Sequence, residues 1–255
     1  MKNKTLIFNE IIGSKKYKSI DKNLINRIID EESPKYKKDK LIIKAVKNRL
    51  HQIHGAFITI NANHKTKSLL LENKYDEILS LHTSTLERLP FYEEFYQKIF
   101  AITGIPTSIL DIACGFNPFA IKYMKLPNNF QFYAYDINQE SCDLLNSFFT
   151  QNKYQGIAKI MDLTTNVPEE PAEVGLILKF LALMTQQNNQ ETLELLKKLK
   201  VNYIVVSFPT KTLTGLNVGM MNNYKTKFNE IIKDNFSILS EIVFSNELVF
   251  IIKKS

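Results

Sequence analysis

The sequence lacks the features that mark membrane, secreted and metal-binding proteins. None of its apolar stretches approaches the roughly 20 residues needed to cross a bilayer, and the apolar run that opens at Leu6 ends at Phe8, too soon for a signal peptide. Its two cysteines, Cys114 and Cys142, lie 28 positions apart, which is neither a metal-ligand spacing nor a disulfide framework. These absences predict a cytoplasmic protein that uses neither a membrane nor a metal.

Glycine is scarce where a dinucleotide-binding turn would need it. Residues 109–118 read Ile-Leu-Asp-Ile-Ala-Cys-Gly-Phe-Asn-Pro, a buried strand followed by a tight turn, and the next strand ends on Asp136, 21 positions after Gly115. In a doubly wound sheet this spacing sets a small-residue turn against a nucleoside and the acid against its ribose hydroxyls. Asn117 and Ala120 replace the second and third glycines, which disfavours a dehydrogenase. S-adenosylmethionine is the candidate ligand; an ordinary turn without a nucleoside is the alternative.

Acidic residues are few at the start of the chain. Residues 1–50 hold 14 Lys/Arg and 6 Asp/Glu, a net charge of +8, whereas the remainder sums to about −1. A basic arm on a near-neutral body favours a polyanionic partner, although a solvated helical face would carry the same charge. The clusters that favour a partner each flank a tyrosine able to lie on a ribose: Lys15, Lys16 and Lys18 beside Tyr17, and Lys35, Lys37, Lys38 and Lys40 beside Tyr36.

The hydrophobic pattern divides the chain near Pro106. Before it, Leu24, Ile25, Ile28 and Ile29 predict a helix capped by Asp21, and Leu41 to Leu50 predict a second, basic helix. The polar stretch 61–68 is typical of a loop, and further helices are expected around 75–81 and 91–102. After Thr107, strands are expected at 108–113, 130–135, 157–161, 174–179, 203–208, 238–244 and 247–252, with helices between the first five.

This pattern predicts an α/β fold: a seven-stranded sheet with an antiparallel last strand, preceded by an N-terminal helical domain. We expect the helical domain to span 1–105 and the sheet domain 106–255. At the ends of the third and fourth strands, Asp162 with Leu163 suits the adenine, and Lys179 suits the substrate. The alternatives are a turn cap for Asp162 and a surface lysine for Lys179. Cys114 could serve as a nucleophile or as a small packing residue.

Five motifs in order carry a family resemblance: Leu50-His51-Gln52, residues 82–88 (His-Thr-Ser-Thr-Leu-Glu-Arg), residues 114–118, Ser207-Phe208-Pro209 with Lys211, and Gly219-Met220 leading to Asn223-Tyr224. The chain resembles, nearly from end to end, the aminoglycoside-resistance 16S rRNA guanine-N7 methyltransferases. The resemblance implies that residues 106–255 form a Rossmann-like, class I S-adenosylmethionine-dependent methyltransferase sheet, which transfers a methyl group from S-adenosylmethionine to N7 of guanine 1405 in the assembled 30S subunit. It also implies that the N-terminal helical domain docks on folded rRNA.

The resemblance also assigns residues position by position. It implies that Arg88 pairs with the methionine carboxylate and that the remaining cofactor contacts are Phe57, His82, Thr83, Ser84, Ala113, Asp136, Asp162, Leu163, Leu178 and Gln187. Lys179 and Lys211 would position the target nucleotide as catalytic-site residues. Contacts to RNA would come from Lys15, Lys16, Lys18, Lys211, Asn223 and Tyr224. The chain departs from the family at Ala113, where many members have glycine, and at Met221-Asn222, which replaces a pair that is often acidic.

Two other functions fit parts of the sequence. A ribosome-binding assembly factor that keeps the fold without turnover is opposed by the intact Arg88, Asp136 and Asp162. A small-molecule methyltransferase is opposed by the basic arm. Guanine N7 has a free lone pair and loses no proton on methylation, so the leading function needs no general base. The paired base must instead be distorted or flipped, because N7 lies in the deep major groove of RNA.

Overall fold

The computed structural model describes residues 3–55, 62–184, 189–212, 215–216 and 218–255. Its centre is a seven-stranded sheet of order β3-β2-β1-β4-β5-β9-β8. Strands β1 to β5 are parallel, whereas β9 is antiparallel to both β5 and β8. All seven predicted strands are therefore confirmed, and so is the antiparallel orientation of the last one. The strands are β1 (Ser108–Ile112), β2 (Gln131–Asp136), β3 (Gln155–Ile160), β4 (Ala172–Leu178), β5 (Val201–Pro209), β8 (Phe236–Val243) and β9 (Glu247–Lys254).

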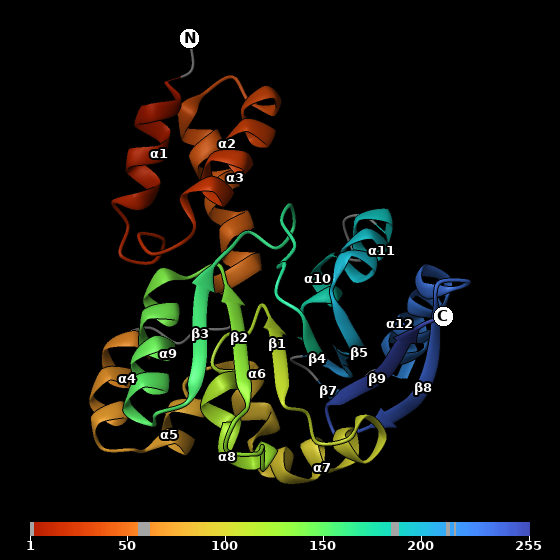
Figure 1. Ribbon diagram of the computed structural model, residues 1–255. Helices are drawn as coiled ribbons and strands as arrows, with labels where there is room; N and C mark the ends of the chain where they lie inside the picture. The colour runs from red at the N-terminus through yellow and green to blue at the C-terminus, as the bar shows by residue number, and fades with distance from the viewer. Residues whose placement is uncertain (1–2, 56–61, 185–188, 213–214, 217) are drawn as a thin grey trace.

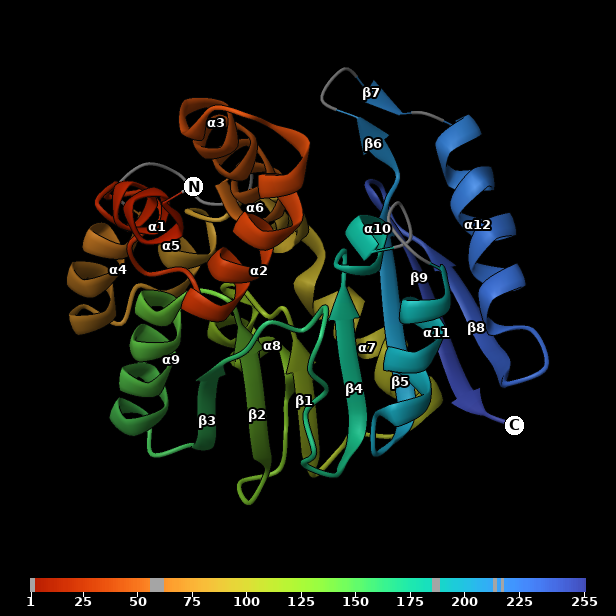
Figure 2. The same cartoon turned by 90° about the horizontal axis from the view of Figure 1, so that it is seen from above.

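Helices cover both faces of this sheet (Figures 1 and 2). One face packs against the cluster that contains Phe95, Ile121 and Leu145, which lie on α7 (Tyr92–Thr103), α8 (Ile121–Met124) and α9 (Gln139–Gln151). The other face packs against α10 (Leu181–Met184), α11 (Asn189–Lys198) and α12 (Val218–Ile232). Parallel strands buried on both sides explain the nearly continuous apolar runs of β4 and β5. A short hairpin, β6 (Lys211–Thr212) with β7 (Gly215–Leu216), precedes α12.

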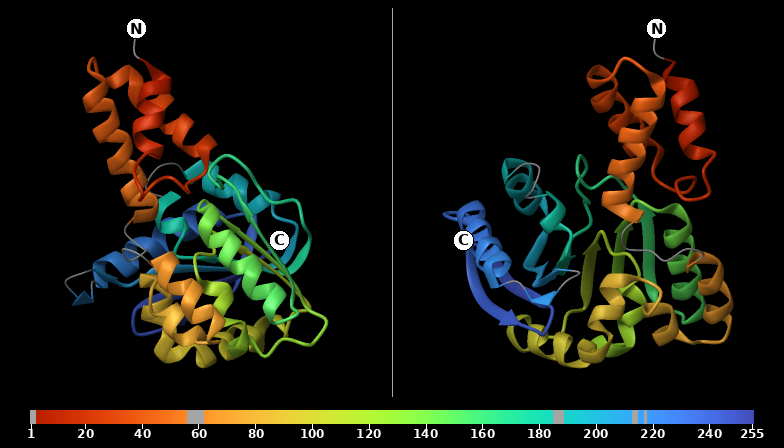
Figure 3. Two further views of the ribbon diagram at one scale, coloured as in Figure 1. Left: turned by 90° about the vertical axis from the view of Figure 1, so that its left-hand side faces the viewer. Right: turned by 180° about the vertical axis from the view of Figure 1, so that it is seen from behind.

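The first three helices have a hydrophobic core of their own. They are α1 (Lys4–Ile12), α2 (Lys22–Glu32) and α3 (Asp39–Leu50), with the 3-10 turn η1 (Ser33–Lys35) between the last two and the π-helical turn η2 (His51–Gly55) after them. Asp21 caps α2 by accepting the N–H of Asn23 at 2.7 Å, as predicted. Figure 1 shows these helices above the ends of β2 and β3, and Figure 3 shows them from the side.

The helices that follow pack with the sheet. They are α4 (Ala62–Leu71), α5 (Tyr75–Leu79), α6 (Thr83–Arg88) and α7, with the 3-10 turn η3 (Leu89–Phe91) before α7 and another, η4 (Asn117–Ala120), before α8. Leu69, Ile78 and Phe95 share one hydrophobic cluster with β1 and β2. The packing thus groups α1–α3 separately from the other helices before β1, and the expected division of the chain at residue 105 stays a prediction.

Two local expectations are wrong. Residues 62–68 belong to α4 rather than to a loop, because Thr66, Leu69 and Leu70 recur at helical spacing and are buried. No helix separates β3 from β4, where a turn and extended chain cover 161–171. Pro168 and Pro171 interrupt this segment, and proline disfavours a helix both at its own position and at the residue before it.

The N-terminal helices are tied to the sheet by main-chain hydrogen bonds. The N–H of Asp21 donates to the carbonyl of Ile137 at 2.8 Å, and the N–H of Gln139 donates to that of Ser19 at 2.7 Å. Ile20 and Asn138 form the antiparallel bridge between these bonds. The start of α2 is therefore fixed to the loop that directly follows β2. Within the described residues, the structure has no helix with the length and apolar character needed to cross a membrane.

Candidate active site

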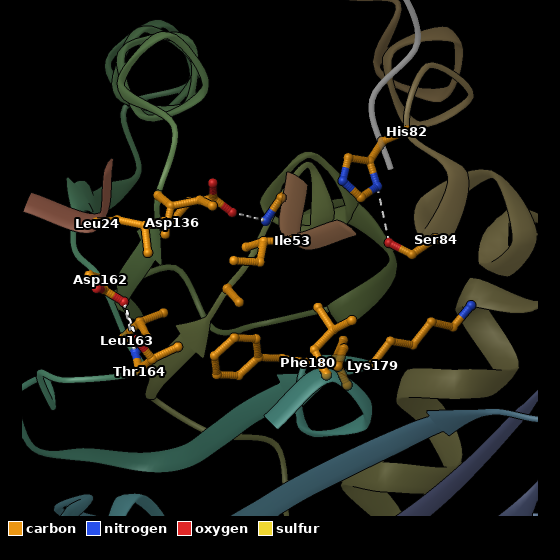
Figure 4. Close-up of a pocket in the computed structure, with 15 residues that line it drawn as sticks. Leu24, Ile53, His82, Ser84, Asp136, Asp162, Leu163, Thr164, Lys179 and Phe180 are labelled. Atoms are coloured by element: carbon orange, nitrogen blue, oxygen red, sulfur yellow. Dashed lines mark hydrogen bonds between the residues drawn. The ribbon is translucent and has the colours of Figure 1, made fainter. Parts of the chain in front are cut away.

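A pocket lies where the parallel strands end, between the sheet and the N-terminal helices (Figure 4). Eight of the residues predicted from the sequence line it: His82, Ser84, Ala113, Asp136, Asp162, Leu163, Leu178 and Lys179. In Figure 4 the two acids lie on one side of the pocket, opposite His82, Ser84 and Lys179. The structure thus gathers residues that are nearly 100 positions apart. Their individual roles remain predictions.

The turn after β1 takes an unusual backbone conformation. Ala113 and Gly115 both lie in the left-handed region, with φ of +53° and +51°. A Cβ at Gly115 would come within 2.9 Å of Nε2 of His82, so this position accepts only glycine without a shift. The imidazole of His82 is held by Ser84, whose hydroxyl lies 3.0 Å from Nδ1. The turn therefore presents backbone rather than side chains to the pocket, as close approach of a ligand requires.

Asp136 ends β2 beside this turn. Its Oδ2 accepts the N–H of Gly115 at 2.9 Å, and its Oδ1 accepts the N–H of Asn138 at 3.0 Å. These two bonds fix the plane of the carboxylate and leave acceptor positions free, since an ionised carboxylate has about four. An acid held in this way can accept two ribose hydroxyls.

Asp162 follows β3 and is 3 % exposed. Its Oδ1 accepts the N–H of Thr164 at 3.1 Å and also the Thr164 hydroxyl, so the turn-cap role that we considered is present. Asp162 nevertheless lines the pocket next to Leu163. Its Oδ2 accepts Nε of Arg27 at 3.0 Å, from helix α2. One residue thus caps the turn, faces the pocket and contacts the N-terminal helices.

Lys179 sits at the end of β4 with a left-handed backbone, at φ +63°. Its N–H lies 3.0 Å from both the carbonyl oxygen and the hydroxyl of Ser207, and its ammonium lies 2.6 Å from Oε2 of Glu87. Oε2 of Glu247 is 3.7 Å away. The side chain is 7 % exposed, so the alternative of a surface lysine is wrong.

Arg88 is predicted to pair with the methionine carboxylate, and that role stays a prediction. Arg88 does not line the pocket and is 1 % exposed. Nε and Nη2 donate to the two carboxylate oxygens of Glu247 at 3.1 and 2.7 Å. Burial alone raises the pKa of Glu247, but the charges of Arg88 and Lys179 bring it below its usual value. The guanidinium therefore neutralises a buried acid, and nothing in the local sequence indicates this long-range pairing.

The other predicted residues divide into three groups. Thr83 is partly buried beside the pocket without lining it, and Phe57 and Gln187 lie outside the described residues. Lys211 begins β6, but its side chain also lies outside them. Asn223 is exposed on α12, and Tyr224 stacks on Phe208 with ring centroids 4.9 Å apart.

The basic N-terminal surface is partly as expected. Lys15, Lys16 and Lys18 are exposed, with Lys16 bound to His51 and Lys18 to Glu140. Nζ of Lys16 lies 5.8 Å from the ring centroid of Tyr17, but the ring is not exposed as a stacking surface. It is buried among α1–α3, and its hydroxyl donates to the carbonyl of Lys47 at 3.1 Å.

Cys114 behaves as a packing residue. It is a free, buried thiol in the hydrophobic cluster behind the turn. Burial and the nearby Asp136 and Asp111 raise its pKa well above the usual value, so the nucleophilic thiolate is disfavoured.

Sequence reasoning missed seven lining residues. Ile137, Thr164 and Phe180 each lie within two positions of a predicted strand-end residue, so their neighbourhood in sequence is a signal. Gly115 belonged to the recognised turn. Leu24 and Ile53 come from the N-terminal helices, and Leu183 comes from α10. From the sequence, Leu24 is predicted only as a core residue of a helix. Its place in the pocket depends on tertiary packing, which the local pattern does not show.

The fold and the pocket together define a class of enzyme. A parallel sheet with this strand order and an inserted antiparallel last strand, a small-residue turn after β1 and an acid after β2 characterise class I S-adenosylmethionine-dependent methyltransferases. The residues present fit that cofactor: two carboxylates face the pocket at adjacent strand ends, and Ala113 and Gly115 of the turn after β1 line it as well. Among the described residues, no group of three or more His, Cys, Asp or Glu is arranged to hold a metal ion.

Comparisons with known proteins narrow the class. The chain belongs to the ribosomal RNA methyltransferase (FmrO) family, whose sequence model matches residues 13–251. It is 31 % identical to a 16S rRNA (guanine(1405)-N(7))-methyltransferase of Serratia marcescens over 245 residues, covering 96 % of each chain. It is 30 % identical to the enzyme of the same name from Proteus mirabilis, covering 96 % of this chain and 95 % of that one.

Solved structures agree with this assignment. The 16S rRNA methyltransferase RmtF in complex with S-adenosyl-L-homocysteine superimposes with a TM-score of 0.92 at 30 % identity, covering 100 % of this chain and 99 % of that chain. The 16S rRNA methylase RmtB superimposes with a TM-score of 0.88 at 29 % identity, covering 100 % of both. The cofactor of this protein is S-adenosylmethionine.

Proposed function

We propose that the protein transfers the methyl group of S-adenosylmethionine to N7 of guanine 1405 of 16S rRNA in the assembled 30S subunit, and that this confers aminoglycoside resistance. The observation that carries the proposal is the match, over nearly the whole of both chains, to relatives named for this reaction. The pocket adds support, because its predicted cofactor residues come together at one end of the sheet.

The residues of the chain divide the work of binding. Asp136 holds the ribose, Asp162 with Leu163 holds the adenine, and the turn 113–115 gives backbone contact. His82 and Ser84 lie opposite the acids and hold the amino-acid end. S-adenosylmethionine, when bound, supplies an electrophilic methyl group on a sulfonium. Orienting the reacting atoms within such a pocket accounts for several kcal/mol of barrier lowering, about 7–11 in the best intramolecular cases.

The acceptor nitrogen needs alignment rather than proton removal. Guanine N7 attacks through an existing lone pair, so no base has to accept a proton. Lys179 is the candidate for this alignment among the polar residues that line the pocket. Its ammonium is held between Glu87 and Glu247 at the end of β4. We propose that Lys179 and Lys211 position the target nucleotide.

The docking surface is proposed to lie within residues 1–105. Lys15, Lys16 and Lys18 are exposed in the segment between α1 and α2, next to α9, where Lys18 pairs with Glu140. Phosphate contacts from such a surface would offset the few kcal/mol needed to flip a base. Asn223 and Tyr224 on α12 would contact the target loop.

The test is methyl transfer from labelled S-adenosylmethionine to purified 30S subunits and, in parallel, to protein-free 16S rRNA, with the modified base mapped. We expect label in the 30S sample alone, at N7 of guanine 1405. Asp136→Asn should abolish it, whereas Asp143→Asn, an exposed acid on the nearby helix α9, should leave it unchanged. Label in naked rRNA would remove the docking proposal. Tight 30S binding without transfer would indicate an assembly factor instead.

A further inference from the structure

Helix α2 forms part of the wall of the pocket. Leu24 lines the cavity, and the residues just before α2 pair with Ile137–Gln139 beside Asp136. One turn beyond Leu24, Arg27 binds the carboxylate of Asp162. Helix α2 and the residues just before it therefore contact the loop that follows Asp136 and the loop that contains Asp162. Main-chain bonds fix the first contact and a side-chain bond fixes the second.

The guanidinium of Arg27 organises the acceptors around Asp162. Nε donates to Oδ2 of Asp162 at 3.0 Å, and Nη2 donates to the hydroxyl oxygen of Thr164 at 2.6 Å. That hydroxyl in turn donates its own hydrogen to Oδ1 of Asp162. Because Arg27 occupies the lone pair of Thr164, the hydroxyl hydrogen is directed at the acid. Arg27 thus acts on both oxygens, on one directly and on the other through Thr164.

The count of donors leaves room for one more. The carboxylate of Asp162 accepts three hydrogen bonds, from the Thr164 N–H, the Thr164 hydroxyl and Arg27 Nε. Nη2 of Arg27, which donates to Thr164, also lies 3.0 Å from Oδ2. A carboxylate offers about four acceptor positions. Asp162 is 3 % exposed and lines the pocket, so a donor bound in the cavity can use the remaining position. One amino group is the donor that such a site takes.

Arg27 is itself held in place by α2 and α3. Its Nη1 donates to Oε1 of Glu31 at 2.7 Å, and Arg49 of α3 binds Glu31 and Glu32. Burial alone raises the pKa of Glu31, but hydrogen bonds from Arg49 and Arg27 bring it below the usual value, so the acid stays ionised. The chain of charges runs from Asp162 into the N-terminal helices.

We propose that Arg27 is a positioning residue for adenine recognition: it holds the Asp162 carboxylate so that its last acceptor position meets the adenine amino group. The cofactor's base is then selected jointly by the methyltransferase sheet and the N-terminal helices. This inference rests on the proposed adenine contact of Asp162 and extends it to a residue 135 positions away.

The test compares two ligands by isothermal titration calorimetry: S-adenosyl-L-homocysteine and its inosine analogue, in which an oxo group replaces the amino group. Arg27→Gln should weaken S-adenosyl-L-homocysteine by roughly 10- to 100-fold, the worth of a hydrogen bond to a charged group. It should leave the inosine analogue nearly unchanged, so the selectivity ratio collapses. Arg27→Lys keeps the positive charge but lacks the paired donors of the guanidinium, so its selectivity ratio should lie between those of the wild type and Arg27→Gln. Lys22→Gln, exposed on the same helix, is the matched control.

A ratio of the two affinities that Arg27→Gln leaves unchanged would overturn the proposal. If both ligands were weakened equally, the cause would be a general loss of structure. If Arg27→Gln does not fold, as judged by circular dichroism, Arg27→Lys decides the matter by the same ratio. The double variant Arg27→Gln/Asp162→Asn should lose no more selectivity than Asp162→Asn alone, since both act through one acceptor.

This readout is separate from methyl transfer. A wild-type protein that discriminates the two ligands through Arg27 but does not methylate 30S subunits would refute the proposed function and keep the inference. A protein that methylates guanine 1405 and shows no effect of Arg27 on selectivity would support the proposed function and refute the inference about Arg27. If Asp162→Asn alone leaves selectivity intact, both the adenine contact and the role of Arg27 are wrong.

Discussion

Arg88 and Glu247, 159 positions apart in sequence, form a bidentate ion pair in which both side chains are essentially inaccessible to solvent. The guanidinium also lies 4.9 Å from the ring centroid of Phe95. The pair joins α6 to the first residue of β9, directly beside the Lys179 ammonium. It is therefore a structural connection beneath the pocket.

Removing one partner of this pair should be costly. Glu247→Gln leaves a buried guanidinium without a counter-charge, and we expect a loss of about 3–5 kcal/mol in the free energy of unfolding, measured by urea denaturation. Glu94→Gln breaks the exposed pair with Lys98 on α7 and should cost under about 1 kcal/mol. A loss of S-adenosyl-L-homocysteine affinity in Arg88→Met without a loss of stability would instead support the predicted role of Arg88 in binding the methionine carboxylate.

Asp111 should make stability fall as the pH rises. It is buried in β1, its Oδ1 has no hydrogen-bond partner among the residues that the structure describes, and burial raises its pKa to about 7. The unfolded acid titrates near pH 3.9. Between about pH 4 and 7 the unfolded chain therefore binds fewer protons than the folded one, and stability declines with pH before levelling off above 7.

Asp111→Asn isolates this contribution, because it replaces the acid with a neutral amide that can still accept from Nδ2 of Asn117. The free energy of unfolding of the variant, relative to wild type, should increase from pH 5 to pH 7 and then stay constant. Urea titrations at four pH values measure the difference. A difference that does not change with pH would show that Asp111 is ionised throughout.

The two left-handed residues of the cofactor turn should respond oppositely to exchange. Ala113→Gly relieves a backbone cost of about 1–2 kcal/mol, partly offset by the greater freedom of glycine when unfolded, so we expect a gain of up to about 1 kcal/mol in stability. Gly115→Ala should lose about 1–2 kcal/mol or more, because it adds that same cost and drives the Cβ toward His82. Thermal unfolding of both variants, side by side, checks the sign.

Charge reversal on the N-terminal surface should separate docking from cofactor binding. Lys15→Glu should weaken binding to 30S subunits and reduce the dependence of affinity on salt, since each phosphate contact contributes to that slope. The affinity for S-adenosyl-L-homocysteine should not change. Lys16→Glu and Lys18→Glu should act similarly, although these side chains also contact His51 and Glu140. An equal fall in cofactor affinity would contradict this division of labour.

The sheet could be predicted well because its strands carry their signal locally. Apolar runs such as those of β4 and β5, bounded by polar turns, indicate buried parallel strands without reference to the rest of the chain. Helix α4 has a weak apolar pattern: Lys65, Lys67 and Ser68 are exposed, and the buried residues among those of the helix whose side chains the structure describes are Thr66, Leu69 and Leu70. The missing helix between β3 and β4 was marked by Pro168 and Pro171, a signal that was present and not used.

The site could be predicted where function depends on strand ends. Asp136, Asp162 and Lys179 each follow a strand, so topology alone brings them to one edge of the sheet. The partners of these residues could not be found, because Arg27 contacts Asp162 across 135 positions and Glu247 contacts Arg88 across 159. Pairings at such separations leave no periodic pattern in a single sequence.

The two main-chain bonds between Ser19–Asp21 and Ile137–Gln139 bear on how this enzyme can be recombined with others. Main-chain bonds do not depend on side-chain identity, so a foreign helical segment could dock there in the correct register. The contact of Arg27 with Asp162 and Thr164 has no such tolerance. A chimera that exchanges the N-terminal helices alone would fold over the pocket and yet lose its preference for adenine, unless an arginine at the position of Arg27 is transferred with them.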